Sequence, residues 1–150
     1  MQNRPVKYWA FQANPTRYRI LDAVQQCAGD TWMIDRGDIQ PGDYALIWKS
    51  QGKDGWRGVV AFAEVLSYPI QQPTAHPEYY IDLVDRRILL VRATIRYILL
   101  PNLPLKVNGN GHSAIEDLTV NGHQGTFFKV KPQQWTTVVQ AAGGWPKQYS

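Results

Sequence analysis

Three runs of mainly apolar residues, each bounded by glycine or proline, constrain most strongly what this chain can fold into. Residues 44–48 follow a Pro-Gly-Asp turn, residues 58–65 follow a loop with two glycines, and residues 88–99 end before Pro101. The first two runs are typical of buried strands. In the third, apolar residues alternate with Arg92, Thr94 and Arg96, which predicts a strand with one apolar and one polar face. Helices do not alternate regularly with them, so the pattern predicts a small α+β barrel rather than a doubly wound sheet.

Shorter elements are predicted around these strands. Residues 8–11 are aromatic and predict a first strand, while residues 127–130 predict a last one. Apolar residues recur at helical spacing over residues 15–28 and over residues 132–142, and each stretch has a proline at its first position. A Ser-x-x-Glu capping box at residues 113–116 predicts a further short helix.

Length and composition are typical of one globular domain. The chain has 150 residues, 44% hydrophobic and 19% charged, and we expect a single domain over residues 1–150. No apolar run approaches the ~18–20 residues that cross a bilayer, so no membrane association is expected. Cys27 is the only cysteine and can form no internal disulfide, which favours a cytoplasmic location.

The positive charge is mild but unevenly distributed. The 16 Lys and Arg against 12 Asp and Glu give a net charge of +4. Residues 1–21 and residues 86–115 contain basic side chains and no acidic ones. Two such segments are compatible with a positive face for phosphates, and equally with scattered solvated charge.

The sequence contains no pattern typical of catalysis or metal binding. The three histidines lie far apart in predicted loops, and neither a Walker loop nor a Gly-x-Ser-x-Gly motif is present. Cys27 lies on the apolar face of a predicted helix. The carboxylate pairs Asp35/Asp38 and Asp82/Asp85 are interpreted as shaping loops or meeting arginines. We therefore expect no enzyme activity, no metal and no cofactor.

Six tryptophans make the aromatic content of the chain high. Trp32 follows the first predicted helix, and Trp48 ends a predicted strand just before Lys49-Ser50. A protein that binds a nucleic-acid base needs a π-face, fixed hydrogen-bonding groups and cations, and these segments contain all three. Core packing is the other common use of tryptophan.

Several segments, in order along the chain, resemble the EVE domain, a PUA-like family related to the YTH readers of methylated adenine. They are Tyr8-Trp9-Ala10-Phe11-Gln12-Ala13-Asn14-Pro15, Asp30-Thr31-Trp32, Pro41-Gly42-Asp43, Ile47-Trp48-Lys49-Ser50, Gly58-Val59-Val60-Ala61, Tyr68-Pro69 with Pro73-Thr74-Ala75, and Gly125-Thr126 with Gln134-Trp135. Each segment is weak alone, but their order and spacing are specific and span nearly the whole chain. The resemblance implies a PUA-like β-barrel of about five to six strands flanked by short helices.

The resemblance also implies a function. EVE domains are associated with modified cytosine in DNA, and RNA roles are suspected as well. We therefore expect non-enzymatic binding of one modified base, most of all modified cytosine in DNA, in an aromatic pocket. The alternatives are a modified-RNA binder and a small-molecule sensor for nucleobase-like ligands. The identity of any effector protein partner is left open.

Similarity to the YTH pocket implies particular pocket residues. Trp32 becomes the first aromatic wall, Met33 offers a backbone carbonyl, and Ala13 and Asn14 lie against the base edge. Tyr97 becomes a second wall, although its place on the apolar face of a strand makes core packing an equal alternative. Asn14 also has a rival role as a helix cap.

The strand-end segment adds further site residues. Trp48 and Ser50 match the corresponding segment of the family, where the serine is placed to hydrogen-bond a base. The residues expected to contact phosphates are Lys49, Lys53, Arg57, Arg92 and Arg96.

Overall fold

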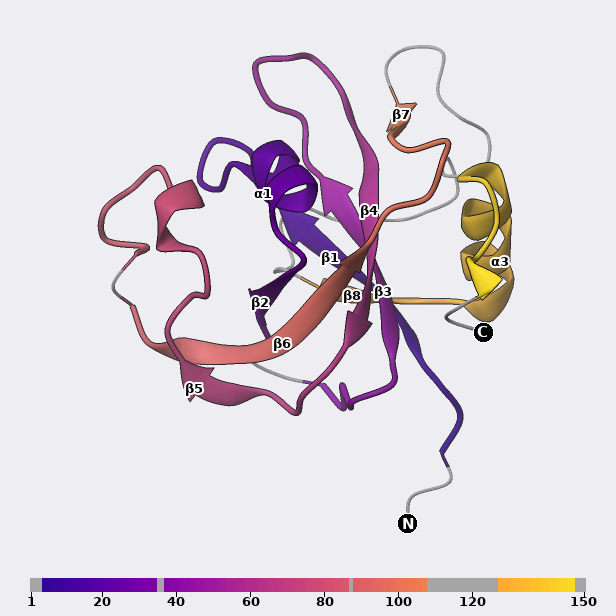
Figure 1. Cartoon of the computed structure of the whole chain (residues 1–150), viewed down its shortest axis with the longest axis horizontal. Helices are drawn as coiled ribbons and strands as arrows, with labels where there is room; N and C mark the ends of the chain where they lie inside the picture. Colours follow the sequence, from indigo (N-terminus) through magenta and orange to yellow (C-terminus); the bar gives the residue numbers. More distant parts are fainter. Residues whose placement is uncertain (1–3, 35–36, 87, 108–126, 148–150) are drawn as a thin grey trace.

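One curled sheet with helices packed beside it forms the body of the protein (Figure 1). The computed structural model describes residues 4–34, 37–86, 88–107 and 127–147. The strands are β1 (Tyr8–Ala13), β2 (Gly29–Met33), β3 (Tyr44–Lys49), β4 (Arg57–Val65), β5 (Ile70–Gln72), β6 (Leu90–Ile98), β7 (Leu105–Val107) and β8 (Phe127–Val130). The helices are α1 (Ile20–Gln26) and α3 (Pro132–Ala141), with a 3-10 turn, η1, at Pro77–Tyr79.

The strand pairing produces a half-barrel. The order across the sheet is β2-β6-β4-β3-β1-β8, with β5 beside β6 and β7 beside β4. β1 and β3 run parallel, and the other described pairs are antiparallel. The nine-residue strands β4 and β6 each bond to three partners along their length, so the sheet curls through them. This mixed, curled sheet confirms the predicted α+β barrel class.

The sequence pattern located five of the eight strands that the structure describes and missed the other three. The predicted strands correspond to β1, β3, β4, β6 and β8 and are confirmed. The missed strands, β2, β5 and β7, have five residues or fewer and no clear alternation of apolar and polar residues. Their extended conformation comes from pairing with longer neighbours, which a local pattern does not record.

The first helix begins later than predicted. Instead of covering residues 15–28, α1 begins at Ile20. The side-chain oxygen of Asn14 accepts hydrogen bonds from the backbone N–H of Thr16 at 3.0 Å and from its hydroxyl at 2.7 Å. This side-chain turn occupies the stretch that was expected to be the first helical turn. Asn14 therefore caps a turn and not the helix.

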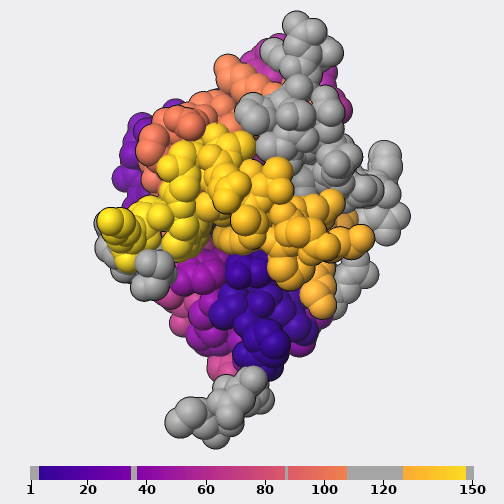
Figure 2. Space-filling model, turned by 90° about the vertical axis from the view of Figure 1, so that its right-hand side faces the viewer, coloured from indigo at the N-terminus to yellow at the C-terminus, as the bar shows by residue number. Residues whose placement is uncertain are grey.

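The C-terminal helix α3 is confirmed and covers one face of the sheet (Figure 2). Its buried Trp135 packs in one cluster with Leu46 and Trp48 of β3, whereas Ile47 between them belongs to a second cluster on the opposite face. Alternate residues of β3 thus serve two cores. None of the described helices is long and apolar enough to cross a bilayer. The capping box at residues 113–116 lies outside the described residues.

The basic side chains near the N-terminus do not form a free positive face. Each of the four pairs with an aspartate: Arg4 with Asp43, Lys7 with Asp38, Arg17 with Asp85, and Arg19 with Asp22. Three of these aspartates lie more than thirty residues away along the chain. Folding brings them next to the arginines and the lysine, so an acid-free stretch of sequence did not become an acid-free surface.

Candidate functional site

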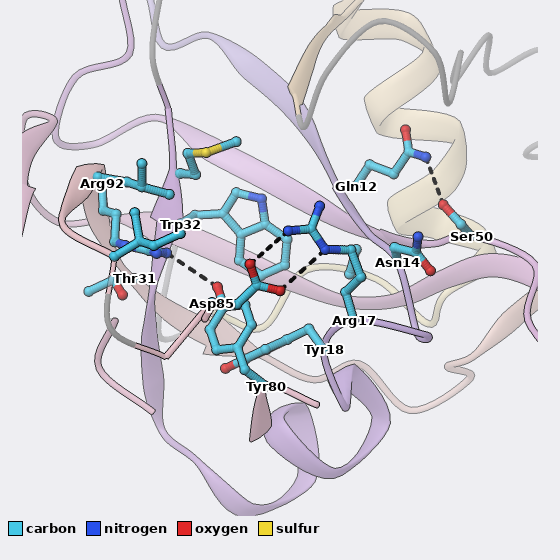
Figure 3. A pocket seen from close by; sticks show the side chains of 14 residues that line it. Gln12, Asn14, Arg17, Tyr18, Thr31, Trp32, Ser50, Tyr80, Asp85 and Arg92 are labelled. Atoms are coloured by element: carbon cyan, nitrogen blue, oxygen red, sulfur yellow. Dashed lines mark hydrogen bonds and ion pairs between the residues drawn. The ribbon is translucent and has the colours of Figure 1, made fainter. Parts of the chain in front are cut away.

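A cavity of about 350 Å³ opens beside the ends of β1 and β2 (Figure 3). Its walls come from the turn after β1, from β2, from Ser50 after β3, from the segment between η1 and β6, and from β6 itself. Ligand pockets commonly have volumes of about 300–1,000 Å³. The space is therefore sufficient for one small planar group.

Aromatic side chains form much of the wall. The indole of Trp32 is stacked on Phe11 of β1, with ring centroids 5.8 Å apart and planes 16° from parallel. Only 7% of Trp32 is exposed, but the cavity lies beside it. Tyr18 and Tyr80 line the same cavity, with ring centroids 4.5 Å apart. Three aromatic side chains, Trp32, Tyr18 and Tyr80, therefore line the space.

A buried carboxylate fixes these walls. Asp30 Oδ2 accepts hydrogen bonds from the hydroxyls of Tyr18 at 2.6 Å and Tyr97 at 2.5 Å. Asp30 Oδ1 accepts the backbone N–H of Thr31 at 2.8 Å. These bonds tie β2 to β6 and to the segment before α1, directly beside Trp32.

Burial favours the uncharged form of all three groups, because it raises their pKa values. It raises the pKa of Asp30, although the hydrogen bonds from Tyr18 and Tyr97 act in the other direction. Burial, together with the nearby Asp30 charge, also raises the hydroxyl pKa of Tyr18 and of Tyr97. Both tyrosines therefore remain hydrogen-bond donors at neutral pH.

An ion pair borders the opening of the cavity. Arg17 Nη2 lies 2.8 Å from Asp85 Oδ1, and Arg17 Nε donates to Asp85 Oδ2 at 3.3 Å. In Figure 3 this pair is drawn across the Trp32 indole. Asp82 Oδ1 accepts the backbone N–H of Val84 at 3.0 Å. The interpretation of this carboxylate pair is confirmed, since Asp85 meets an arginine and Asp82 shapes the loop.

Polar groups lie at opposite ends of the cavity (Figure 3). At one end, Gln12 Nε2 donates to Ser50 Oγ at 2.7 Å, and the backbone N–H of Ser50 donates to the carbonyl of Ala13 at 2.9 Å. At the other end, Arg92 Nη1 donates to the hydroxyl of Tyr80 at 3.2 Å. A planar ligand between them has hydrogen-bonding groups at both edges.

The structure brings five of the seven predicted pocket residues together. The ones that line the cavity are Ala13, Asn14, Trp32, Met33 and Ser50. Trp48 packs against α3 on the opposite face of the sheet. Tyr97 lies behind the wall with its hydroxyl on Asp30 and does not line the cavity.

Lys49, one of the predicted phosphate contacts, is completely buried. Its ammonium donates to Asp54 at 2.9 Å and to the carbonyl of Trp56 at 2.7 Å, and it lies 3.9 Å from the centre of the Trp56 ring. These contacts hold the loop between β3 and β4. The ammonium is thereby turned away from a surface-bound phosphate.

The other four basic residues have different environments. Lys53 and Arg57 are exposed. Arg96 is partly exposed and bonds to Glu64. Arg92 is 2% exposed, within the cavity wall. Of the predicted phosphate contacts, Lys53 and Arg57 are therefore the two that are exposed.

Sequence reasoning missed eight residues that line the cavity: Gln12, Arg17, Tyr18, Thr31, Tyr80, Asp85, Ile88 and Leu90. Most of them lie in a turn or in the segment after η1, where no periodic pattern shows which side chain faces inward. The paired carboxylates at residues 82 and 85 were the one available hint. Within the described residues, no three His, Cys, Asp or Glu side chains group as a metal site.

Comparison with known proteins identifies the family. The family model described as the EVE domain matches residues 7–141. The chain belongs to the EVE domain family. Its curled mixed sheet with flanking helices is accordingly an α+β fold of the PUA-like kind. EVE and related PUA-like domains are generally binding domains, and nucleic acid is the general class of ligand that the family suggests.

Solved structures share this EVE fold at low sequence identity. The NMR structure of Rpa0253 from Rhodopseudomonas palustris is 17% identical, with a TM-score of 0.58 over 91% of this chain and 93% of that one. A hypothetical protein from Leishmania major is 14% identical, with a TM-score of 0.56 over 91% and 94%. A crystal structure of a Pseudomonas putida protein is 14% identical, with a TM-score of 0.56 over 90% and 99%. No curated protein matches the chain.

The raised pKa of Asp30 predicts how stability depends on pH. Above the unfolded-state pKa of about 3.9, the folded protein holds a proton that the unfolded chain has released. The free energy of unfolding of the wild type, relative to Asp30→Asn, should therefore fall as pH rises through the folded-state pKa and then level off. Urea unfolding of both proteins across this pH range measures the difference.

Asp38→Asn is a control for which the stability difference from the wild type should change with pH in the opposite direction. The hydrogen bond from Lys7 lowers the pKa of Asp38, so the contribution of this carboxylate is lost as pH falls. If the wild type instead gained stability over Asp30→Asn with rising pH, the buried carboxylate would not have the raised pKa that we assign to it.

Proposed function

We propose that this EVE domain binds one modified base of a nucleic acid, modified cytosine in DNA foremost, in the cavity beside Trp32. The protein holds the base and performs no chemistry on it. The observation that carries the proposal is a cavity for one planar group, bordered by Trp32, Tyr18 and Tyr80 and polar at both ends.

The shape of the site supports a base taken out of its stack. Removing a base from a duplex costs a few kcal/mol, which stacking and edge hydrogen bonds in a pocket must replace. Trp32 is already stacked on Phe11, so its indole is fixed before any ligand arrives. A preorganised wall of this kind loses little side-chain entropy on binding.

Ordered hydrogen-bonding groups support recognition of the base edge. Gln12 donates a hydrogen bond to Ser50, and the backbone N–H of Ser50 donates to Ala13 at the end of β1. The carboxamide oxygen of Gln12 is buried without a partner in the described part of the chain. Asn14 lines the cavity beside them. A base with a donor on the edge that faces Gln12 satisfies that oxygen.

The exposed cations Lys53 and Arg57 are available to phosphates outside the cavity. Lys53 lies in the loop after Ser50, and Gly52 in that loop lies against the side chain of Pro15 in the turn after β1. A nucleic-acid backbone that leaves the cavity on this side passes the exposed ammonium. Electrostatic contacts of this kind make binding dependent on salt.

Substitution of Trp32 tests the pocket. Stacking contributes roughly 1–3 kcal/mol per base, so Trp32→Leu should weaken binding of a short oligonucleotide with one 5-methylcytosine by about 10–100-fold. Trp32→Phe keeps a π-face and should lose less. Fluorescence anisotropy measures both affinities, and circular dichroism verifies that both variants are folded.

Trp145→Ala is the matched control. Trp145 packs against Trp135 and Tyr44 on the α3 side of the sheet, away from the cavity. This variant also loses an indole but should keep the affinity of the wild type. Equal affinities of wild type and Trp32→Leu would contradict the proposed pocket.

Salt dependence separates a nucleic-acid ligand from a free nucleobase or nucleoside. For each phosphate contact that is lost, the slope of log affinity against log salt should become shallower by ~0.7 on a single strand. Lys53→Gln and Arg57→Gln should each produce a change of this size with little effect on base preference. Affinity that is indifferent to salt would favour the small-molecule alternative. A panel in both DNA and RNA identifies the preferred polymer.

A further inference from the structure

Arg92 of β6 carries a buried positive charge that no carboxylate neutralises among the described residues. The side chain is 2% exposed and borders the cavity. Its only side-chain hydrogen bond in the described ranges is the 3.2 Å contact from Nη1 to the Tyr80 hydroxyl. Its Nε is buried and has no hydrogen-bond partner in the part of the chain that the structure describes. A buried guanidinium with unused donors is unfavourable unless a further acceptor completes it.

The position of Arg92 specifies what that acceptor is. In Figure 3, Arg92 lies at the end of the cavity opposite Gln12 and Ser50, with Trp32 between the two ends. A guanidinium only donates hydrogen bonds, so the ligand group that meets it must accept them. A ligand that stacks on Trp32 presents its edge, and not its backbone, to this end.

The charges that line the cavity favour oxygen as this acceptor. Arg17 and Asp85 neutralise each other, so Arg92 leaves the lining residues with one net positive charge. A carbonyl oxygen carries two lone pairs and a substantial partial negative charge, and arginine commonly donates to base carbonyls in this way.

We propose that Arg92 recognises a carbonyl oxygen on the bound base. This inference rests on the proposed function and narrows its ligand class to bases with an exocyclic oxygen, which include cytosine. It excludes adenine, whose acceptors are ring nitrogens. Arg92 then contacts the base directly and determines specificity, in place of the phosphate contact predicted from the sequence.

A carbonyl deletion in the ligand, combined with removal of the guanidinium, tests this contact. The ligands are two single-stranded oligonucleotides, one with 5-methylcytosine and one with the 2-amino-3-methylpyridine C-nucleoside at the same position. The pyridine keeps the amino, ring nitrogen and methyl groups but has C–H in place of the carbonyl. Affinities of both oligonucleotides are measured for wild type, Arg92→Met and Arg92→Lys, at mildly alkaline pH where both rings are neutral.

The expected result is coupling between the two deletions. A hydrogen bond to a charged group is worth roughly 1.5–3 kcal/mol, so the wild type should prefer the carbonyl ligand by about 10–100-fold. Arg92→Met should bind both oligonucleotides with nearly equal, weaker affinity. Arg92→Lys, which keeps the charge without the planar fork, should show an intermediate preference.

Two controls keep the outcome interpretable. Arg19→Met removes an exposed arginine that bonds to Asp22, outside the cavity, and should retain the full preference. Replacing a buried charge by a similar apolar volume is commonly neutral for folding, and thermal unfolding verifies this for Arg92→Met.

The contrary results are distinct. Equal wild-type affinity for the two oligonucleotides, with binding still lost in Trp32→Leu, overturns the role of Arg92 and leaves the pocket intact. A preference that persists in Arg92→Met overturns it as well. If neither oligonucleotide binds in a manner that depends on Trp32, the proposed function fails and this inference fails with it.

Discussion

The hydrogen bonds that converge on Asp30 are the interaction on which the cavity depends. Asp30 of β2 is buried beside β6 and the segment before α1. Its carboxylate accepts hydrogen bonds from the hydroxyls of Tyr18 and Tyr97 and from the backbone N–H of Thr31. Burial disfavours its charge, and the hydrogen bonds from these three donors offset part of that cost. The position of Tyr18 in the wall and the course of β2 next to Trp32 are therefore set together.

The two-sided sheet separates packing from binding. Residues on one face, including Trp48 and Trp135, pack beneath α3. Residues on the other face include Phe11 and Trp32, and the cavity opens on this side, beside the ends of β1 and β2. The same residue type, tryptophan, thus packs in a closed core on one face of the sheet and lines an open cavity on the other.

The sequence predicted the fold class and the long strands because burial on both faces imposes nearly continuous apolar runs on β3 and β4, while apolar and polar residues alternate along β6. It also placed Trp32 in the site, through the resemblance to a family and not through any periodicity. The same reasoning could not tell Trp48 from Trp32, since the face of the sheet depends on register.

Charge was the least predictable property. Arg92 occupies the polar side of an alternating strand, where a solvated or phosphate-binding arginine is the ordinary expectation. The curl of the sheet and the segment that carries Tyr80 enclose it instead. Likewise Lys49, next to a strand end, is buried by its contacts with Asp54 and Trp56. The burial of Arg92 depends on a segment distant in sequence, and the burial of Lys49 depends on the conformation of the following loop.

The most direct test of the account is the structure of the complex in solution. NMR spectra of the labelled protein with a short single-stranded oligonucleotide, carrying one 5-methylcytosine, report which protein protons lie against the base. The account predicts intermolecular contacts from the base ring and its methyl group to the rings of Trp32 and Tyr80. Contacts confined to another surface, with the Trp32 resonances unchanged, would contradict it.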